Sequence, residues 1–120
     1  MKLRFRAWLK QKQKMDNEID HISWLEDELY CIGDGITYMV SAEDLVLMQS
    51  TGLKDKNGKE IFEGDVVKCN GLLGTIESFK AMWICSFVKY NNYQKVGFFA
   101  QEIEVVGNVY ENPELLEDKE

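Results

Sequence analysis

Few residues of this 120-residue chain have the types and spacing that chemistry requires. His21 is the only histidine, and with Asp20 and Glu26 close in sequence it could act as a base or ligate a metal ion. Either role needs a partner nucleophile or a second ligand, and the sequence indicates neither. We therefore expect His21 to lie on the surface or to make an ordinary hydrogen bond.

Two acidic groups could supply the oxygen ligands that hard cations prefer. The run Glu26-Asp27-Glu28 is consecutive, so its side chains cannot all face one site on a regular element, and we expect it to be solvated. Glu60, Glu63 and Asp65 suggest a metal-assisted hydrolase, but a two-metal site needs more converging carboxylates than this. Asp65 more simply orders a turn. We expect no enzyme activity, no catalytic residue, no cofactor and no metal.

The three cysteines also give little indication of a metal or redox site. Cys31, Cys69 and Cys85 are far apart and form no C-x-x-C pair, so we expect buried thiols in a reducing compartment. No apolar run approaches the ~18 residues of a membrane span, and no apolar stretch follows the basic N-terminus as in a signal peptide. The expected location is the cytoplasm, with no membrane partner.

A candidate interaction surface lies near the N-terminus. Residues 2–8 alternate between the two faces of a predicted half-buried strand, with Arg4, Arg6 and Trp8 on one face. Cations and an aromatic ring on one face could bind phosphates and stack on single-stranded bases. They could equally form the solvated face of an edge strand that is protected from aggregation by its charges. The formal net charge of −7 opposes nucleic-acid binding, so we favour the solvated face.

The elements around residues 45–68 give the clearest structural signals. The apolar run 45–48 predicts a strand buried on both faces. Asp55-Lys56-Asn57-Gly58 predicts a tight hairpin turn, because Asp and Asn bond to their own backbone there. Glu63-Gly64-Asp65 predicts a second turn before a strand that begins at Val66. Short strands joined by short polar turns are typical of a small barrel or sandwich.

The remaining strands are predicted by apolar and β-branched runs at 30–32, 36–40, 82–90, 96–100 and 103–110. Asn70-Gly71 predicts a two-residue hairpin, and residues 33–35 and 90–93 predict further turns. Gly107 predicts a bulge or bend. Residues 16–28 are compatible with a helix or a strand, and the neighbouring segments favour a strand. Asn112-Pro113-Glu114 predicts a short helical turn whose Leu115 and Leu116 pack back onto the barrel.

Aromatic side chains are frequent in the second half of the chain. They could line a peptide groove, as aromatics do in SH3 domains, or fill the core, and aromatics at strand spacing favour the core. The residues concerned are Trp83, Phe87, Tyr90, Tyr93, Phe98 and Phe99.

Three segments resemble the YopX family of small proteins encoded by phages and prophages. Met48–Val67, with the sequence MQSTGLKDKNGKEIFEGDVV, resembles the family's signature. Lys2–Trp8 resembles its opening strand and Ile103–Leu116 its closing segment. The resemblance implies a mainly β fold with an SH3-like barrel in the C-terminal part. It implies no activity and adds no functional residue.

We therefore expect one YopX-like domain over residues 1–120. Its parts are an N-terminal strand and hairpin region over 1–50, packed on a small SH3-like barrel over 51–116, and a frayed acidic tail at 117–120. One short helical turn lies near the C-terminus.

The predicted function is a non-enzymatic protein-interaction or self-assembling module. Six of the fourteen Lys and Arg lie within residues 1–14, whereas 16–34 hold seven acids and no Lys or Arg. Such blocks can pair within one fold or between subunits, so the partner is an unknown protein or a second copy of this chain. The alternative is single-stranded nucleic-acid binding through the basic N-terminal strand.

Overall fold

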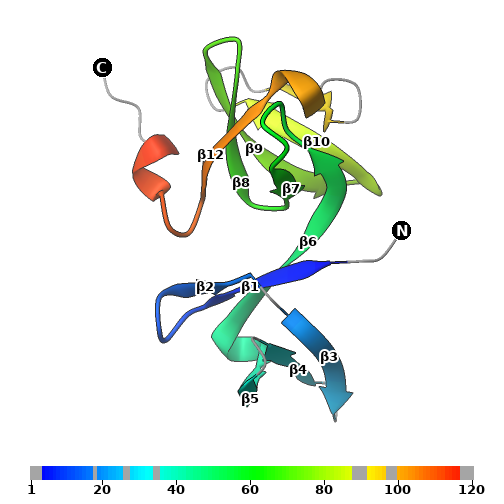
Figure 1. Cartoon of the computed structure of the whole chain (residues 1–120), viewed down its shortest axis with the longest axis vertical. Helices are drawn as coiled ribbons and strands as arrows, with labels where there is room; N and C mark the ends of the chain where they lie inside the picture. Colours follow the sequence, from blue (N-terminus) through cyan, green and yellow to red (C-terminus); the bar gives the residue numbers. More distant parts are fainter. Residues whose placement is uncertain are drawn as a thin grey trace. The chain divides into compact units, whose positions relative to one another are not determined.

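The computed structural model describes residues 4–17, 19–25, 28–33, 36–87, 92–96 and 100–116. The chain separates into two compact units, Lys2–Gln49 and Ser50–Glu120, and the boundary falls inside β6 (Leu45–Lys54). Both units are built of β-strands, which confirms the mainly β prediction (Figure 1). In the described parts, no helix is long and apolar enough to cross a membrane.

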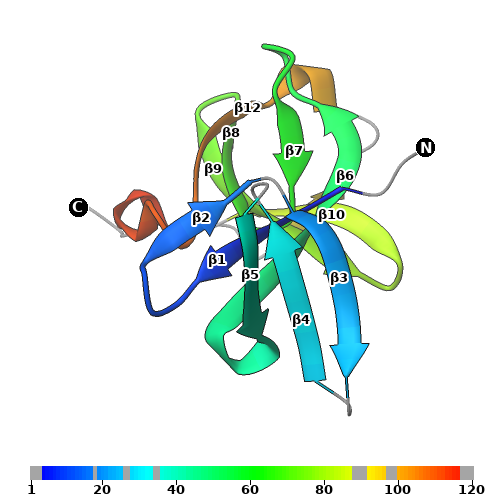
Figure 2. The same cartoon turned by 60° about the horizontal axis from the view of Figure 1, so that its bottom comes forward.

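The first unit contains five complete strands and the first half of β6. β1 (Phe5–Leu9) lies between β2 (Lys14–Asp16) and β6 and is antiparallel to both. β3 (Ile19–Leu25), β4 (Glu28–Gly33) and β5 (Ile36–Ser41) form a separate antiparallel sheet (Figure 2), and η1 (Ala42–Asp44) leads into β6. The preference for a strand over a helix within 16–28 is confirmed. Asp34 and Gly35 of the predicted turn lie outside the described residues.

The prediction of a half-buried edge strand is wrong for β1. All four residues from Arg6 to Leu9 are buried, although the alternation predicted one solvated face. The strand order explains one part of the error: β1 has a hydrogen-bonded neighbour on each side, so it is a central strand and not an edge strand. Ala7 and Leu9 form a small core with Leu45.

The second unit is built around a five-stranded antiparallel sheet with the order β11-β10-β9-β8-β12. Its strands are β8 (Asp65–Cys69), β9 (Leu72–Phe79), β10 (Met82–Phe87), β11 (Asn92–Lys95) and β12 (Glu104–Asn108). The sheet curls into a half-barrel, as the SH3-like prediction requires (Figure 1). β7 (Glu60–Phe62) pairs with the second half of β6.

The core of this unit lies inside the curled sheet. Eight buried residues form it: Ile61, Val67, Cys69, Ile76, Cys85, Val96, Ala100 and Ile103. Trp83 and Phe87 pack against this cluster, so the core interpretation is confirmed for these two aromatics. Tyr90, Phe98 and Phe99 lie outside the described residues, and only the backbone of Tyr93 is described. Cys69 and Cys85 are buried thiols as predicted, and burial raises the pKa of Cys85 to about 12.

Two predictions between β10 and β12 need correction. Asn92 and Tyr93, placed in a turn by the sequence, begin β11. Ala100, placed at the end of a strand, begins the 3-10 turn η3 (Ala100–Glu102). The Ile103 N–H donates to the Ala100 carbonyl at 3.3 Å, and this turn directs both apolar side chains into the core. Burial of Ala100 and Ile103 therefore overrides the β-propensity of the sequence.

The predicted turns at Asp55–Gly58, Glu63–Asp65 and Asn70-Gly71 are present. Asp65 is 1% exposed, and its carboxylate accepts a hydrogen bond from the Phe62 N–H at 2.8 Å, so it orders the Glu63-Gly64 turn. The register of β12 against β8 shifts between Val105 and Gly107, which confirms the bulge. Pro113–Leu116 forms the short helical turn η4.

Asp55 connects the β6–β7 turn to β12. Its carboxylate accepts three backbone hydrogen bonds, from Asn57 N–H, Lys59 N–H and Val105 N–H, each at 2.9 Å. A fourth bond, from Lys56 N–H to the Ile103 carbonyl at 3.0 Å, joins the same two segments. Burial would raise the pKa of Asp55, but the three N–H donors outweigh it and lower the pKa below 3.8.

Two hairpins of the second unit have the same turn geometry and different residues. Asn70 and Gly71 join β8 to β9 with φ of 51° and 83°, and Lys80 and Ala81 join β9 to β10 with φ of 49° and 63°. Two consecutive positive φ values define a type I′ turn, which favours Asn-Gly. The second hairpin thus holds two L-residues in a strained conformation.

We predict opposite effects of glycine exchange at these turns. Ala81→Gly should raise the free energy of unfolding by about 0.5 kcal/mol because it relieves the positive φ. Gly71→Ala should lower it by about 1 kcal/mol, and a Cβ at that position meets no atom within 4 Å, so the backbone alone sets the cost. Urea denaturation of both variants checks this. Equal midpoints for the two variants would contradict the type I′ assignment.

We predict that Asp55→Asn lowers the free energy of unfolding at pH 7 by about 2–4 kcal/mol, because buried N–H groups lose a charged acceptor. The folded pKa lies below the unfolded value of 3.8, so the contribution of Asp55 is complete above that pH. It is lost as the pH falls through the folded pKa. Urea denaturation as a function of pH should therefore show the wild type and the variant converging in acid. A constant difference down to the lowest pH would contradict the assignment.

Candidate functional site

The N-terminal candidate surface is only partly accessible. Arg4 is exposed, but Arg6 and Trp8, in the central strand β1, are only 6% and 7% exposed. Two of the three side chains are therefore not on the solvated face that the alternation predicted. Whether Arg4, Arg6 and Trp8 take part in an interaction stays a prediction.

The acidic candidates Glu60 and Asp65 bond to different partners. The Ser50 hydroxyl donates a hydrogen bond to the Glu60 carboxylate, and Asp65 is held by the Phe62 N–H. Among the residues that the structure describes, no three His, Cys, Asp or Glu side chains are grouped to hold a metal ion. His21 lies in β3, where only its backbone is described, and Glu26 and Asp27 lie outside the described residues.

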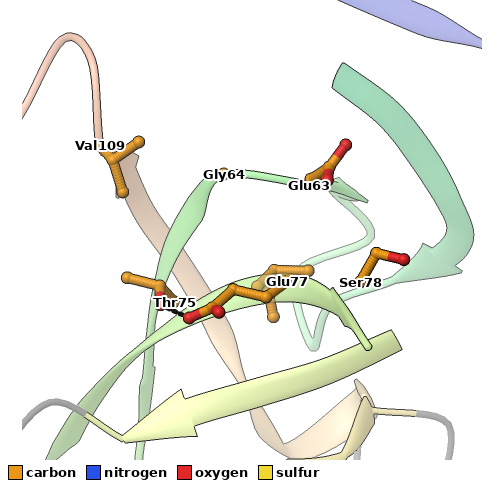
Figure 3. Close-up of a pocket in the computed structure, with 7 residues that line it drawn as sticks. Glu63, Gly64, Thr75, Glu77, Ser78 and Val109 are labelled. Carbon is orange, nitrogen blue, oxygen red and sulfur yellow. Dashed lines mark hydrogen bonds between the residues drawn. The ribbon is translucent and has the colours of Figure 1, made fainter. Parts of the chain in front are cut away.

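The structure shows an open hollow in the second unit that the sequence analysis did not find. It has a volume of about 360 Å³ and lies between the Glu63-Gly64 turn and β9 (Figure 3). Its lining comes from the β7–β8 turn, from β9 and from the segment after β12: Glu63, Gly64, Thr75, Ile76, Glu77, Ser78 and Val109. Glu63 and Ser78 lie toward one end of the hollow, and Thr75 and Val109 toward the other.

The hollow exists because β9 is longer than its neighbour β8. β8 pairs with β9 only from Cys69↔Leu72 to Val66↔Thr75, whereas β10 pairs with β9 as far as Phe79. One further bond on the β8 side runs from the Gly64 N–H to the Ile76 carbonyl at 2.9 Å. Beyond it, no strand of the described chain pairs with that side of Glu77–Phe79.

Ser78 is the residue whose backbone faces this open side. The N–H and C=O groups of an antiparallel strand alternate between its two neighbours. Since the carbonyl of Ile76 points to the β8 side, the N–H and C=O of Ser78 point there too. The side chain of Ser78 is exposed, so solvent reaches this part of the strand.

The surroundings of the open strand end combine negative charge with apolar surface. Glu63 lies on the turn at one end, and Glu77 is exposed on β9, where its carboxylate accepts a hydrogen bond from the Thr75 hydroxyl at 2.8 Å. Phe79 is 39% exposed, and the Lys80 ammonium lies 5.3 Å from the centre of its ring. The hollow thus offers carboxylates, hydroxyls and a backbone edge, which suit binding of a polypeptide segment.

No local sequence signal identified this site. Its position depends on two strand ends, Asp65 of β8 and Phe79 of β9, that do not coincide in register. The turn signal at Asn70-Gly71 fixed the pairing, and a comparison of the strand lengths on its two sides could have shown the overhang.

Comparisons with known proteins place the chain in a family. The family model described as YopX protein matches residues 4–117. The crystal structure of protein EF1440 from Enterococcus faecalis is similar, with a TM-score of 0.71, 27% sequence identity, and 98% of this chain and 99% of that chain covered. The crystal structure of protein yopX from Bacillus subtilis has the same fold, with a TM-score of 0.62, 21% identity, and 97% of each chain covered. Among curated protein sequences, none matches the chain. Because the family model spans all but the first three and the last three residues, the chain belongs to the YopX protein family.

Proposed function

We propose that this protein is a non-enzymatic protein-interaction module that binds an extended segment of a partner at the open end of β9. The observation that carries the proposal is the overhang of β9 beyond β8, which leaves the backbone of Ser78 facing an open hollow. An extended peptide can add to such an edge, with main-chain hydrogen bonds supplying affinity and neighbouring side chains supplying specificity.

The edge of the sheet at β12 is a poorer place for strand addition. There, Asp55 accepts the Val105 N–H and Lys56 donates to the Ile103 carbonyl, so the β6–β7 turn occupies the backbone groups that a peptide would need. The end of β9 is not covered in this way by the described turns. The family resemblance further supports a phage or prophage protein that acts in the cytoplasm of the bacterial host, and both belong to the proposal.

Single-stranded nucleic-acid binding is the weaker alternative. It needs cations and an aromatic ring on one accessible face, and Arg6 and Trp8 are buried. The net charge of −7 also disfavours a polyanion.

Ser78→Pro tests strand addition directly. Proline removes the N–H that faces the open side, where no described strand accepts it, so the ladder with β10 should persist. Ser78→Ala is the matched control, because it removes the hydroxyl and keeps the N–H. We predict that short peptides selected from a random display library against the wild type bind the proline variant at least about tenfold more weakly and the alanine variant unchanged.

Titration calorimetry measures the affinities, and urea denaturation confirms that both variants are folded. Amide chemical shifts of 15N-labelled protein locate the bound peptide, and we expect the largest changes between Ile76 and Phe79. Peptides that bind the proline variant as tightly as the wild type, or failure of the library to give any binder, would overturn the proposal.

A further inference from the structure

We propose that the segment bound at the end of β9 carries a lysine or arginine that is directed at Glu77, with an apolar residue two positions away. This inference rests on the proposed function and names the chemical class of its partner. The argument combines the charge at the open strand end, the alternation of side chains along β9 and the exposed ring of Phe79.

The negative charge at the open strand end indicates a basic residue in the bound segment. Glu77 is exposed on β9 next to Ser78, and Glu63 adds a second negative charge on the half-buried turn that lines the hollow. A cationic side chain from an added strand would be attracted by the Glu77 carboxylate, and an acidic one would be repelled. The net charge of −7 favours the encounter with a cationic segment in general.

The alternation of side chains along β9 indicates where the basic residue of the bound segment would lie. Thr75 and Glu77 lie on one face of β9, as their side-chain hydrogen bond shows, and Phe79 follows on the same face by the period of two. The residue of an added strand beside Glu77 would therefore form a cross-strand pair with it, and opposite charges are favoured in such pairs. The residue two positions away would lie beside Phe79.

The exposed ring of Phe79 indicates an apolar residue in the bound segment. Phe79 is one of three large hydrophobic side chains in the described chain that are more than a third exposed, with Leu72 and Val106. The ring stays 39% exposed with the Lys80 ammonium 5.3 Å from its centre, so an apolar neighbour gains area by covering it.

Selection from the same random peptide library tests the inference without altering the protein. We expect the binders to be enriched in a lysine or arginine with an apolar residue two positions away. Replacing that basic residue by glutamate in a synthetic copy of a selected peptide should weaken binding at least about tenfold. Binders without a basic residue, or a glutamate copy that binds equally well, would overturn the inference.

Reversal of charge on the protein completes the test. Glu77→Lys should weaken the basic peptide at least about tenfold and should improve binding of its glutamate copy, whereas Glu77→Gln should have a smaller effect. Glu114→Lys is the matched control, because Glu114 is exposed, lies in η4 outside the hollow and carries the same charge change. Equal effects of the Glu77 and Glu114 reversals would show a general charge effect and overturn the inference.

These outcomes separate the inference from the proposed function. If Ser78→Pro abolishes binding and Glu77→Lys leaves it unchanged, strand addition stands and the cationic specificity is wrong. If Ser78→Pro has no effect but Glu77→Lys does, the binding is through charge without strand addition, and the proposed function fails in its stated form.

Discussion

The carboxylate of Asp55 is the interaction on which the closure of the half-barrel depends. It lies 4% exposed in the β6–β7 turn and accepts N–H groups from that turn and from Val105 on β12, a strand fifty positions later in the chain. A charged acceptor with three backbone donors compensates for its own burial, whereas an uncharged side chain there would leave these donors unsatisfied. One residue therefore orders the turn and fixes the last strand of the sheet against it.

This closure also decides where the sheet can be extended. The turn held by Asp55 covers the free edge of β12, and covered edges are protected from unwanted pairing. At the start of β8, the Asp65 carboxylate accepts a hydrogen bond from the Phe62 N–H. The turn before β8 makes its last bond to β9 through Gly64. β9 continues for three residues past the last bond to that turn, which leaves the backbone of Ser78 open. The turn held by Asp55 thus covers the edge of β12, whereas the turn ordered by Asp65 leaves the edge of β9 uncovered at Ser78.

Much of this fold could be predicted from the sequence, because turns have local causes. Asp55–Gly58, Glu63–Asp65 and Asn70-Gly71 fold as their side chains and φ preferences dictate. The central position of β1, in which Arg6 and Trp8 are buried, could not be predicted, since it requires pairing with β6, a strand distant in sequence. The 3-10 turn at Ala100 likewise results from packing around Ile103. The candidate site depends on a mismatch of strand ends, which is a property of the pairing and of no single segment.

The strained β9–β10 turn lies next to the open end of β9, and its residues indicate why the strain is retained. The β8–β9 turn consists of Asn70 and Gly71, which suit its positive φ values. The β9–β10 turn, which directly follows the exposed Phe79, consists of Lys80 and Ala81 instead. Glycine would relieve the positive φ of Ala81, but it would also increase the freedom of the chain next to the exposed ring. Asparagine in place of Lys80 would remove the cation over that ring. Strain that persists beside an exposed aromatic side chain and a strand end that is open on one side is the pattern expected where binding, and not stability, determines the residues.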